Sequence, residues 1–174
     1  MVFRKATETD IPAVSQIYEL IHAAEDRGEL CIGWATGVYP LAEDAQRALV
    51  RDDLYVAEGD GRVYASAIIN QLQVDVYEGA DWEYPAEDDK VLVLHTLCVD
   101  PGCMGKGLGK TFVEYYERLA LERNCPYLRM DTNAKNLRAR AMYKKLGYKE
   151  IGIVPCTFNS IGGVNLVLLE KYLG

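Results

Sequence analysis

The segment CVDPGCMGKGLGKT, from Cys98 to Thr111, places glycine at 105, 107 and 109 and includes two lysines. Glycine lets an anion approach the backbone N–H groups closely, because no side chain stands in the way. An amphipathic run follows, and the start of a helix carries a partial positive charge that favours phosphate. The segment therefore predicts a phosphate-binding turn at the start of a helix, although a flexible helix entry would also use glycine.

Two better-known phosphate motifs do not fit this segment. The triphosphate loop, Gly-x-x-x-x-Gly-Lys-Ser/Thr, matches at Gly109, Lys110 and Thr111, but Met104 occupies the place of its first glycine. The dinucleotide fingerprint Gly-x-Gly-x-x-Gly fails because its last glycine would be Lys110. Both motifs also usually lie near the start of an open parallel sheet, whereas about a hundred residues precede this one. A nucleotide hydrolase is therefore disfavoured.

Two segments together resemble one protein family. VDPGCMGKGLGK is similar to the acetyl-coenzyme A loop of the GNAT superfamily of N-acetyltransferases, Val-x-Pro followed by Arg/Gln-x-x-Gly-x-Gly/Ala at a helix start. NLRARAMYKKLGY, from Asn136 to Tyr148, is similar to the family's Asn-x-x-Ala-x-x-Leu-Tyr-x-x-x-Gly-Phe segment. Met104 departs from the pattern, since it replaces the Arg or Gln and its side chain cannot donate a hydrogen bond.

The resemblance implies acetyl-CoA as the cofactor. Its pyrophosphate is expected on the backbone N–H groups of Gly105 to Lys110, which need no contribution from the Met104 side chain. Its pantetheine arm is expected to pair with the backbone of Leu97 to Val99 like an added strand. The implied cofactor-binding residues are Leu97, Cys98, Val99, Met104, Gly105, Lys106, Gly107, Leu108, Gly109, Lys110, Asn136 and Tyr143.

Some of these residues also have plain structural explanations. Cys98 fits a small apolar strand residue as well as a reactive thiol, and Asn136 fits a helix cap.

The same resemblance implies direct attack of an amine on the thioester, without an acyl-enzyme. Tyr143 is expected to protonate the departing thiolate, since a phenol with a pKa of about 10 can do so. His95 is a candidate general base, with an ordinary pKa of about 6.5. The N–H of Leu97 is a candidate donor to the oxyanion. Tyr143 also belongs to an apolar helix face, and His95 also fits a hydrogen-bonded core histidine, so both structural alternatives stay open.

The expected acceptor is a primary amine of a small molecule or amino-acid derivative, with a peptide or protein amine as the second choice. Its candidate contacts are Trp34, Tyr39, Trp82 and Tyr84, which could equally be core residues. Residues 75–89, DVYEGADWEYPAEDD, form an acidic loop that could attract a cation or simply be solvated. A sensor that binds acetyl-CoA without catalysis would keep the glycine turn but would not need Tyr143.

The elements that position these residues follow the order βααβββαβαββ. The expected strands are 2–6, 54–58, 62–70, 90–99, 127–132, 148–155 and 164–173, and the expected helices are 10–27, 41–50, 109–123 and 136–147. Thr9 or Asp10 is expected to cap the first helix, whose apolar residues recur at helical spacing: Ile11, Val14, Ile17, Tyr18 and Ile21. Gly59, Asp60 and Gly61 predict a hairpin turn, a glycine-rich turn is expected between the last two strands, and Gly147 is the expected C-cap of the last helix. Strand 90–99, helix 109–123 and strand 127–132 make a βαβ unit with parallel strands. The fold class is therefore α/β, a GNAT-type mixed sheet of about seven strands with this parallel pair at its centre and about four helices.

Composition sets the remaining limits. The 174 residues predict a single domain over 1–174, and the net charge of -7 argues against nucleic acid. Five cysteines without a Cys-x-x-Cys pair and only two histidines predict no metal site. Asp131 could end a magnesium-binding strand, but Arg129 beside it argues against that. No signal core or membrane span is evident, so we expect a cytoplasmic protein with no membrane partner and possible homodimers through the terminal strands.

Overall fold

The computed structural model describes residues 1–158 and 160–174, and these residues form two compact units. Unit 1 consists of Met1–Ile69 and His95–Tyr115, and unit 2 consists of Asn70–Leu94 and Tyr116–Gly174. Strand β4 (Val91–Val99) and helix α3 (Leu108–Glu122) contribute residues to both units. The predicted element order is confirmed, with seven strands and four α-helices among the described residues. A single domain over 1–174 stays a prediction.

Unit 1 begins with strand β1 (Val2–Lys5), and the order of its strands is β1-β2-β3-β4. Strands β2 (Leu54–Gly59) and β3 (Arg62–Asn70) form an antiparallel hairpin. Its turn residues Asp60 and Gly61 both have positive φ, 51° and 73°. Two successive residues with positive φ are typical of the tightest hairpin turns, so the predicted hairpin is confirmed.

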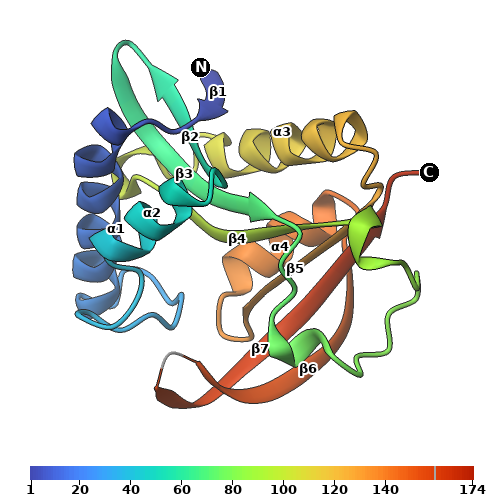
Figure 1. Ribbon diagram of the computed structural model, residues 1–174. Coiled ribbons are helices and arrows are strands. Elements are labelled where there is room, and N and C mark those ends of the chain that lie inside the picture. The colour runs from blue at the N-terminus through green and yellow to red at the C-terminus, as the bar shows by residue number, and fades with distance from the viewer. Residues whose placement is uncertain (159) are drawn as a thin grey trace. The chain divides into compact units, whose positions relative to one another are not determined.

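Helices α1 (Ile11–Asp26) and α2 (Ala42–Val50) lie next to each other and cover one face of the unit 1 strands (Figure 1). Apolar residues recur along α1 every three or four positions, so they form one face of the helix. That face packs into a core shared with α2, β2, β3 and β4: Val14, Ile17, Tyr18, Ile21, Ala45, Ala48, Leu54, Val56, Val63, Ile68 and Cys98. Through Cys98, this core packs against β4.

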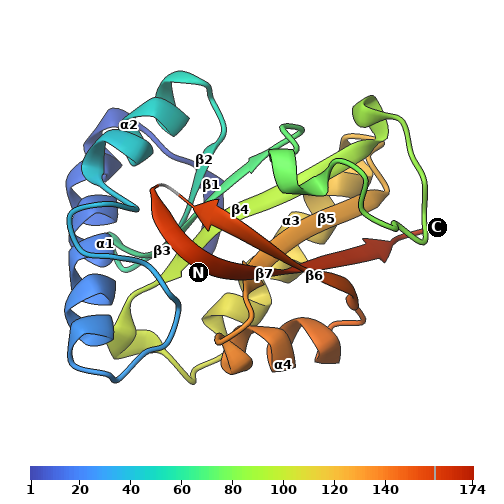
Figure 2. The ribbon, with the colours of Figure 1, turned by 90° about the horizontal axis from the view of Figure 1, so that it is seen from below.

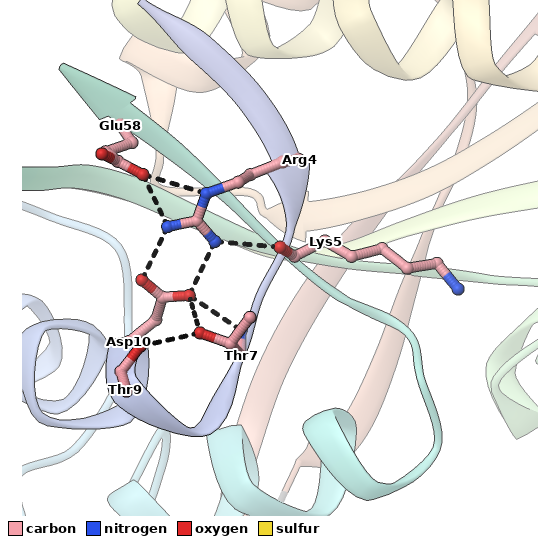
Figure 3. Close-up of polar contacts among 6 residues, drawn as sticks. All are labelled: Arg4, Lys5, Thr7, Thr9, Asp10 and Glu58. Atoms are coloured by element: carbon pink, nitrogen blue, oxygen red, sulfur yellow. Dashed lines mark hydrogen bonds and ion pairs between the residues drawn. The ribbon is translucent and has the colours of Figure 1, made fainter.

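A cluster of charged side chains joins the start of α1 to β1 and β2 (Figure 3). Arg4 on β1 binds Asp10 through two hydrogen bonds of 2.7 and 2.9 Å, and it also donates to Glu58 on β2. The Asp10 carboxylate accepts the backbone N–H of Thr7 at 2.8 Å. Thr9 or Asp10 was expected to cap the helix, but the Asp10 side chain makes no capping hydrogen bond to α1. It points back to Thr7 instead, because a carboxylate three residues on can satisfy that exposed N–H group.

Unit 2 has the strand order β4-β5-β7-β6. Strand β5 (Tyr127–Asn133) pairs in parallel with β4 from Val91–Tyr127 to Leu94–Met130, which confirms the predicted parallel pair. Strands β7 (Ile161–Tyr172) and β6 (Lys149–Phe158) complete the unit as an antiparallel pair. Both strands are longer than predicted, because Gly162 and Gly163 of the expected glycine-rich turn belong to β7. Asn159, which follows β6 in the sequence, lies outside the described residues.

The two faces of the unit 2 strands are covered differently. Helix α4 (Leu137–Lys145) lies on one side of β5 and β7, and the connection from 71 to 90 lies on the other (Figure 2). On the helix side, the buried Tyr116 of α3 donates to the carbonyls of Leu92 and Arg129, at 2.6 and 3.3 Å.

In the part of the chain that the structure describes, none of the helices has the length and apolar character that crossing a bilayer requires.

Candidate active site

The turn after β4 is held in place by Asp100. This buried carboxylate accepts the backbone N–H of Gly102 at 2.8 Å and a guanidinium N–H of Arg62 at 2.5 Å. The backbone carbonyl of Asp100 also accepts the N–H of Cys103, at 2.8 Å. The Asp-Pro pair that ends β4 therefore anchors a short 3₁₀ turn, Pro101–Cys103, and fixes where the glycine segment begins.

Gly105 and Gly107 have φ values of 81° and 83°. Such values favour glycine, because a side chain at Cβ would clash with the neighbouring backbone. A Cβ atom built on Gly107 would meet no protein atom within 4 Å, so the space above this residue is open. Gly109 lies inside α3, where the backbone does not require glycine. Two of the three alternating glycines are thus explained by backbone conformation.

The turn and the first residues of α3 present a series of backbone N–H groups. Among the described residues, no acceptor is found for the N–H groups of Gly105, Gly107, Leu108, Gly109 and Lys110. The first N–H groups of a helix have no partner within the helix, and together with its dipole they favour an anion. The geometry of this segment therefore suits a phosphate held by backbone rather than by side chains.

The two lysines of the segment are already engaged. The ammonium of Lys106 donates to the carbonyl of Gly102 at 3.2 Å, and Lys110 pairs with Glu114 one turn further along α3 at 2.8 Å. Both lysines are exposed, and exposed pairs of this kind contribute little free energy. This weak pairing leaves both ammonium groups able to move toward an anion.

Thr96 in the middle of β4 has a φ of 50°, in the left-handed region. Such a backbone is uncommon for a β-branched residue and costs about 1–3 kcal/mol, so strain of this kind often marks a functional site. The hydroxyl of Tyr39 is hydrogen-bonded to that of Thr96. The parallel pairing of β4 with β5 ends two residues earlier, at Leu94. The regular strand geometry is thus interrupted beside the predicted residues His95 and Leu97.

Cys98 lies in the core of unit 1 with no exposed surface. Burial raises the pKa of its thiol well above the ordinary value. A nucleophilic cysteine needs the opposite, a lowered pKa and access to solvent. Of the two interpretations that the sequence left open, the structure favours the small apolar strand residue. His95, by contrast, is only half-buried and immediately precedes the strained Thr96.

In unit 2, the two predicted residues of the second motif belong to α4. The Asn136 side chain accepts the N–H of Ala139 at 3.1 Å, so it caps the helix as the structural alternative required. Tyr143 is 6% exposed, and its ring packs edge-on against Tyr148 with 5.9 Å between centroids. Gly147, with a φ of 87°, ends the helix as predicted.

The four aromatic residues proposed for the acceptor all have aromatic neighbours. Trp34 and Tyr39 pack edge-on at 6.0 Å in unit 1. In unit 2, Trp82 packs against Tyr77 at 5.3 Å, and Tyr84 stacks on Tyr172 at 5.4 Å. Each therefore has a packing role within its own unit, in addition to any contact with an acceptor.

Part of the acidic loop packs against the sheet, while most of its carboxylates are exposed. Its Tyr77 is buried among Val91, Val93 and Leu168, and the carboxylate of Glu83 pairs with Lys149 at 2.6 Å. Asp75, Glu78, Asp81, Glu87, Asp88 and Asp89 remain exposed. Among residues 1–158 and 160–174, no group of three or more histidine, cysteine or acidic residues is arranged to hold a metal ion.

Comparison with known proteins identifies the family. The Acetyltransferase (GNAT) family profile matches residues 14–148, which include both motifs and most of the chain. The chain belongs to the GNAT acetyltransferase family. It is therefore an acyltransferase of a family whose cofactor is acetyl-CoA.

Relatives of this GNAT chain match over nearly its whole length. An uncharacterised N-acetyltransferase of Methanocaldococcus jannaschii is 26% identical over 175 residues, which cover 98% of this chain and 91% of that protein. A GNAT-family acetyltransferase structure from Streptococcus agalactiae has a TM-score of 0.78 and 25% identity, with 98% and 94% covered. A Salmonella typhimurium protein solved with its cofactor acetyl-CoA has a TM-score of 0.70 and 16% identity, with 99% and 94% covered; it supports the fold.

Two residues of this GNAT chain escaped the sequence reasoning. Thr96 was missed because its left-handed backbone has no signature beyond a polar residue within the apolar run VLVLHTLCV. Asp131 was considered only as a metal ligand, although its carboxylate accepts a hydrogen bond from the buried Tyr77. No sequence pattern connects residues 77 and 131, so only the folded chain reveals this pair.

Proposed function

We propose that this GNAT chain transfers an acetyl group from acetyl-CoA to the primary amine of a small molecule or amino-acid derivative. The observation that carries the proposal is the turn after β4, where five backbone N–H groups find no acceptor among the described residues. A pyrophosphate supplies acceptor oxygens for such amides, and the space above Gly107 is open for it.

The rest of the cofactor would follow β4. The backbone of Leu97 to Val99 would pair with the amide groups of the pantetheine arm, and backbone pairing needs no particular side chain. Met104 replaces the family's Arg or Gln here, but the amides do not depend on that side chain. Asn136 is proposed to contact the cofactor through its amide nitrogen, since its oxygen already caps α4.

The chemistry would be a direct attack within a ternary complex. The neutral amine nitrogen forms a bond to the thioester carbonyl carbon, and the carbon–sulfur bond then breaks. A backbone N–H, proposed to be that of Leu97, stabilises the oxyanion. His95 takes the proton that the amine loses, and Tyr143 gives a proton to the departing thiolate. A phenol suits this last step because its ordinary pKa of about 10 is close to that of a thiol.

A binding assay separates this proposal from its rivals. We expect CoA to raise the free energy of unfolding by about 2.7 kcal/mol at 100 times its dissociation constant, and ATP with magnesium to leave it unchanged. Stabilisation by ATP and not by CoA would overturn the proposal.

A panel of amines with acetyl-CoA and detection of the free thiol then identifies the acceptor. Turnover with small primary amines supports the proposal, and turnover only with peptides points to a protein amine. CoA binding without turnover on any amine would indicate a sensor.

A further inference from the structure

Asp131 has an unusual position on β5. The parallel pairing with β4 ends at Met130, so Asp131 is the first residue of β5 that has no β4 partner, while β7 continues to pair with it through Leu168. Its side chain is half-buried and lies on the strand face that the 71–90 connection covers. A carboxylate at the end of a parallel pairing is therefore held on a rigid element, not on a loop.

The hydrogen bonds of Asp131 leave half of the carboxylate unused. The hydroxyl of Tyr77 donates to Oδ2 at 2.8 Å, whereas no donor to Oδ1 is found among the described residues. Tyr77 is 3% exposed and packs among Val91, Val93 and Leu168. Partial burial raises the pKa of Asp131, and the hydrogen bond from Tyr77 opposes that rise. An ionised carboxylate in such surroundings favours a cation or a strong donor at its open oxygen.

Glu170 on the same sheet face is a carboxylate with a purely structural role. Glu170 on β7 is 2% exposed, and its two oxygens accept the backbone N–H groups of Glu83 and Tyr84, at 2.7 and 3.4 Å. It thereby ties the acidic loop to the strand. Asp131 ties the loop through Tyr77 with one oxygen only, so anchoring the loop does not account for the whole group.

Among the described residues, the basic groups near Asp131 do not neutralise its carboxylate, so an external cation could do so. Arg129, two residues earlier on β5, is stacked on Trp82 at 4.1 Å and donates to Gln73. Cys156 on β6 is the thiol near Asp131, and burial together with the carboxylate raises its pKa. Among the described residues, no lysine or arginine forms an ion pair with Asp131.

We propose that Asp131 binds the ammonium group of the acceptor through Oδ1, with Tyr77 holding the carboxylate in place. This inference rests on the proposed function, since it assigns the acceptor side of that reaction. It makes Asp131 the residue that selects a primary ammonium over a neutral group of the same size. The proton that the ammonium must lose before attack passes to the base and not to Asp131, so the carboxylate has a binding role.

The substitution Asp131→Asn tests this inference, because the amide keeps the size of the side chain and still accepts the Tyr77 hydrogen bond. We expect KM for the best amine of the panel to rise about 10- to 100-fold, the effect of losing one charged hydrogen bond. The dissociation constant of CoA, measured by calorimetry, should not change. Glu87→Gln removes an exposed charge of the same loop and should leave both values unchanged.

A second variant separates a binding role from a merely structural one. Tyr77→Phe removes the hydrogen bond that stabilises the ionised carboxylate, so the pKa of Asp131 should rise. The acid limb of kcat/KM should then move to higher pH, while the value at high pH stays close to that of the wild type.

An unchanged KM in Asp131→Asn, with CoA binding intact, would overturn this inference alone. Absence of CoA binding in the wild type, or a panel that yields no acceptor, would overturn the proposed function and this inference with it. If Asp131→Asn does not fold, an unmoved acid limb in Tyr77→Phe decides against the inference.

Discussion

The glycine turn of unit 1 and the covered sheet face of unit 2 handle polar groups in opposite ways. The turn offers backbone N–H groups from Gly105 to Lys110, and their positions are set by φ values that glycine alone adopts readily. The sheet face offers side chains, Asp131 and Glu170, held by residues of a distant loop. A site made of backbone leaves a mark in the sequence, whereas a site made of side-chain contacts leaves almost none.

From this contrast we predict that changes at Tyr143 or Asp131 in unit 2 impair turnover without affecting cofactor binding. Tyr143→Phe should show the largest effect, a fall in kcat of about 100- to 10,000-fold, because the thiolate loses its proton donor. The dissociation constant of CoA should stay the same. Stopped-flow or steady-state thiol release and calorimetry measure the two values. Equal turnover across pH would remove Tyr143 from the mechanism, and weakened CoA binding would break the comparison.

His95→Ala tests the side-chain base that lies in unit 1. We expect kcat to fall about 100-fold near neutral pH and to recover as the pH rises, because a larger fraction of the amine is then already neutral. The measurement is the pH profile of kcat/KM, with His22→Ala as the control for a histidine that is buried and bonded to the carbonyl of Pro40. A profile that matches the wild type would assign the base to water.

Gly107→Ala tests the backbone site directly. A side chain at a φ of 83° costs about 1–2 kcal/mol, and relief of that strain would turn the amides away from the phosphate. We expect CoA affinity to fall about 10- to 100-fold. Gly37→Ala is the matched control, because Gly37 has a φ of 75° and equally open space around its Cβ position. This variant should lower the free energy of unfolding and leave CoA affinity unchanged. Similar CoA affinity in both variants would contradict a backbone cradle.

Asp10→Asn separates a structural charge cluster from a functional one. Arg4 and Thr7 lower the pKa of Asp10 from 3.8 to about 2, so the ionised form stabilises the folded state above pH 4, and that contribution is lost as the pH falls through 2. The variant should lose about 2 kcal/mol of unfolding free energy near neutral pH. Urea unfolding at pH 7 and at pH 3 measures this difference, which should shrink at the lower pH.

Met104→Arg should have the smallest effect. It restores the side chain of the family pattern, but the proposed phosphate site consists of backbone amides, so we expect CoA affinity to change less than about threefold, or 0.7 kcal/mol. Calorimetry with CoA at two salt concentrations measures it. A gain of tenfold or more would show that side chains share the binding, and the contrast between the two regions would weaken.

Much of the fold was predictable because it depends on local rules. Helix α1 followed from apolar residues at helical spacing, the β2-β3 hairpin from Asp60-Gly61, and the end of α4 from Gly147. The lengths of β6 and β7 were not predictable, because Gly162 and Gly163 are ordinary turn residues that here take part in a strand. Pairing between β6 and β7 extends the strands through these glycines, although the local sequence favours a turn there.

The sequence by itself determined the order of the elements, the parallel pair, the glycine turn and the family, since each follows from short motifs or from the order of consecutive elements. Only the tertiary structure decided that Thr96 is strained, that Cys98 is buried and inert, and that Tyr77 meets Asp131. The reason is physical: burial and hydrogen bonding between residues 54 positions apart depend on packing that no local pattern encodes.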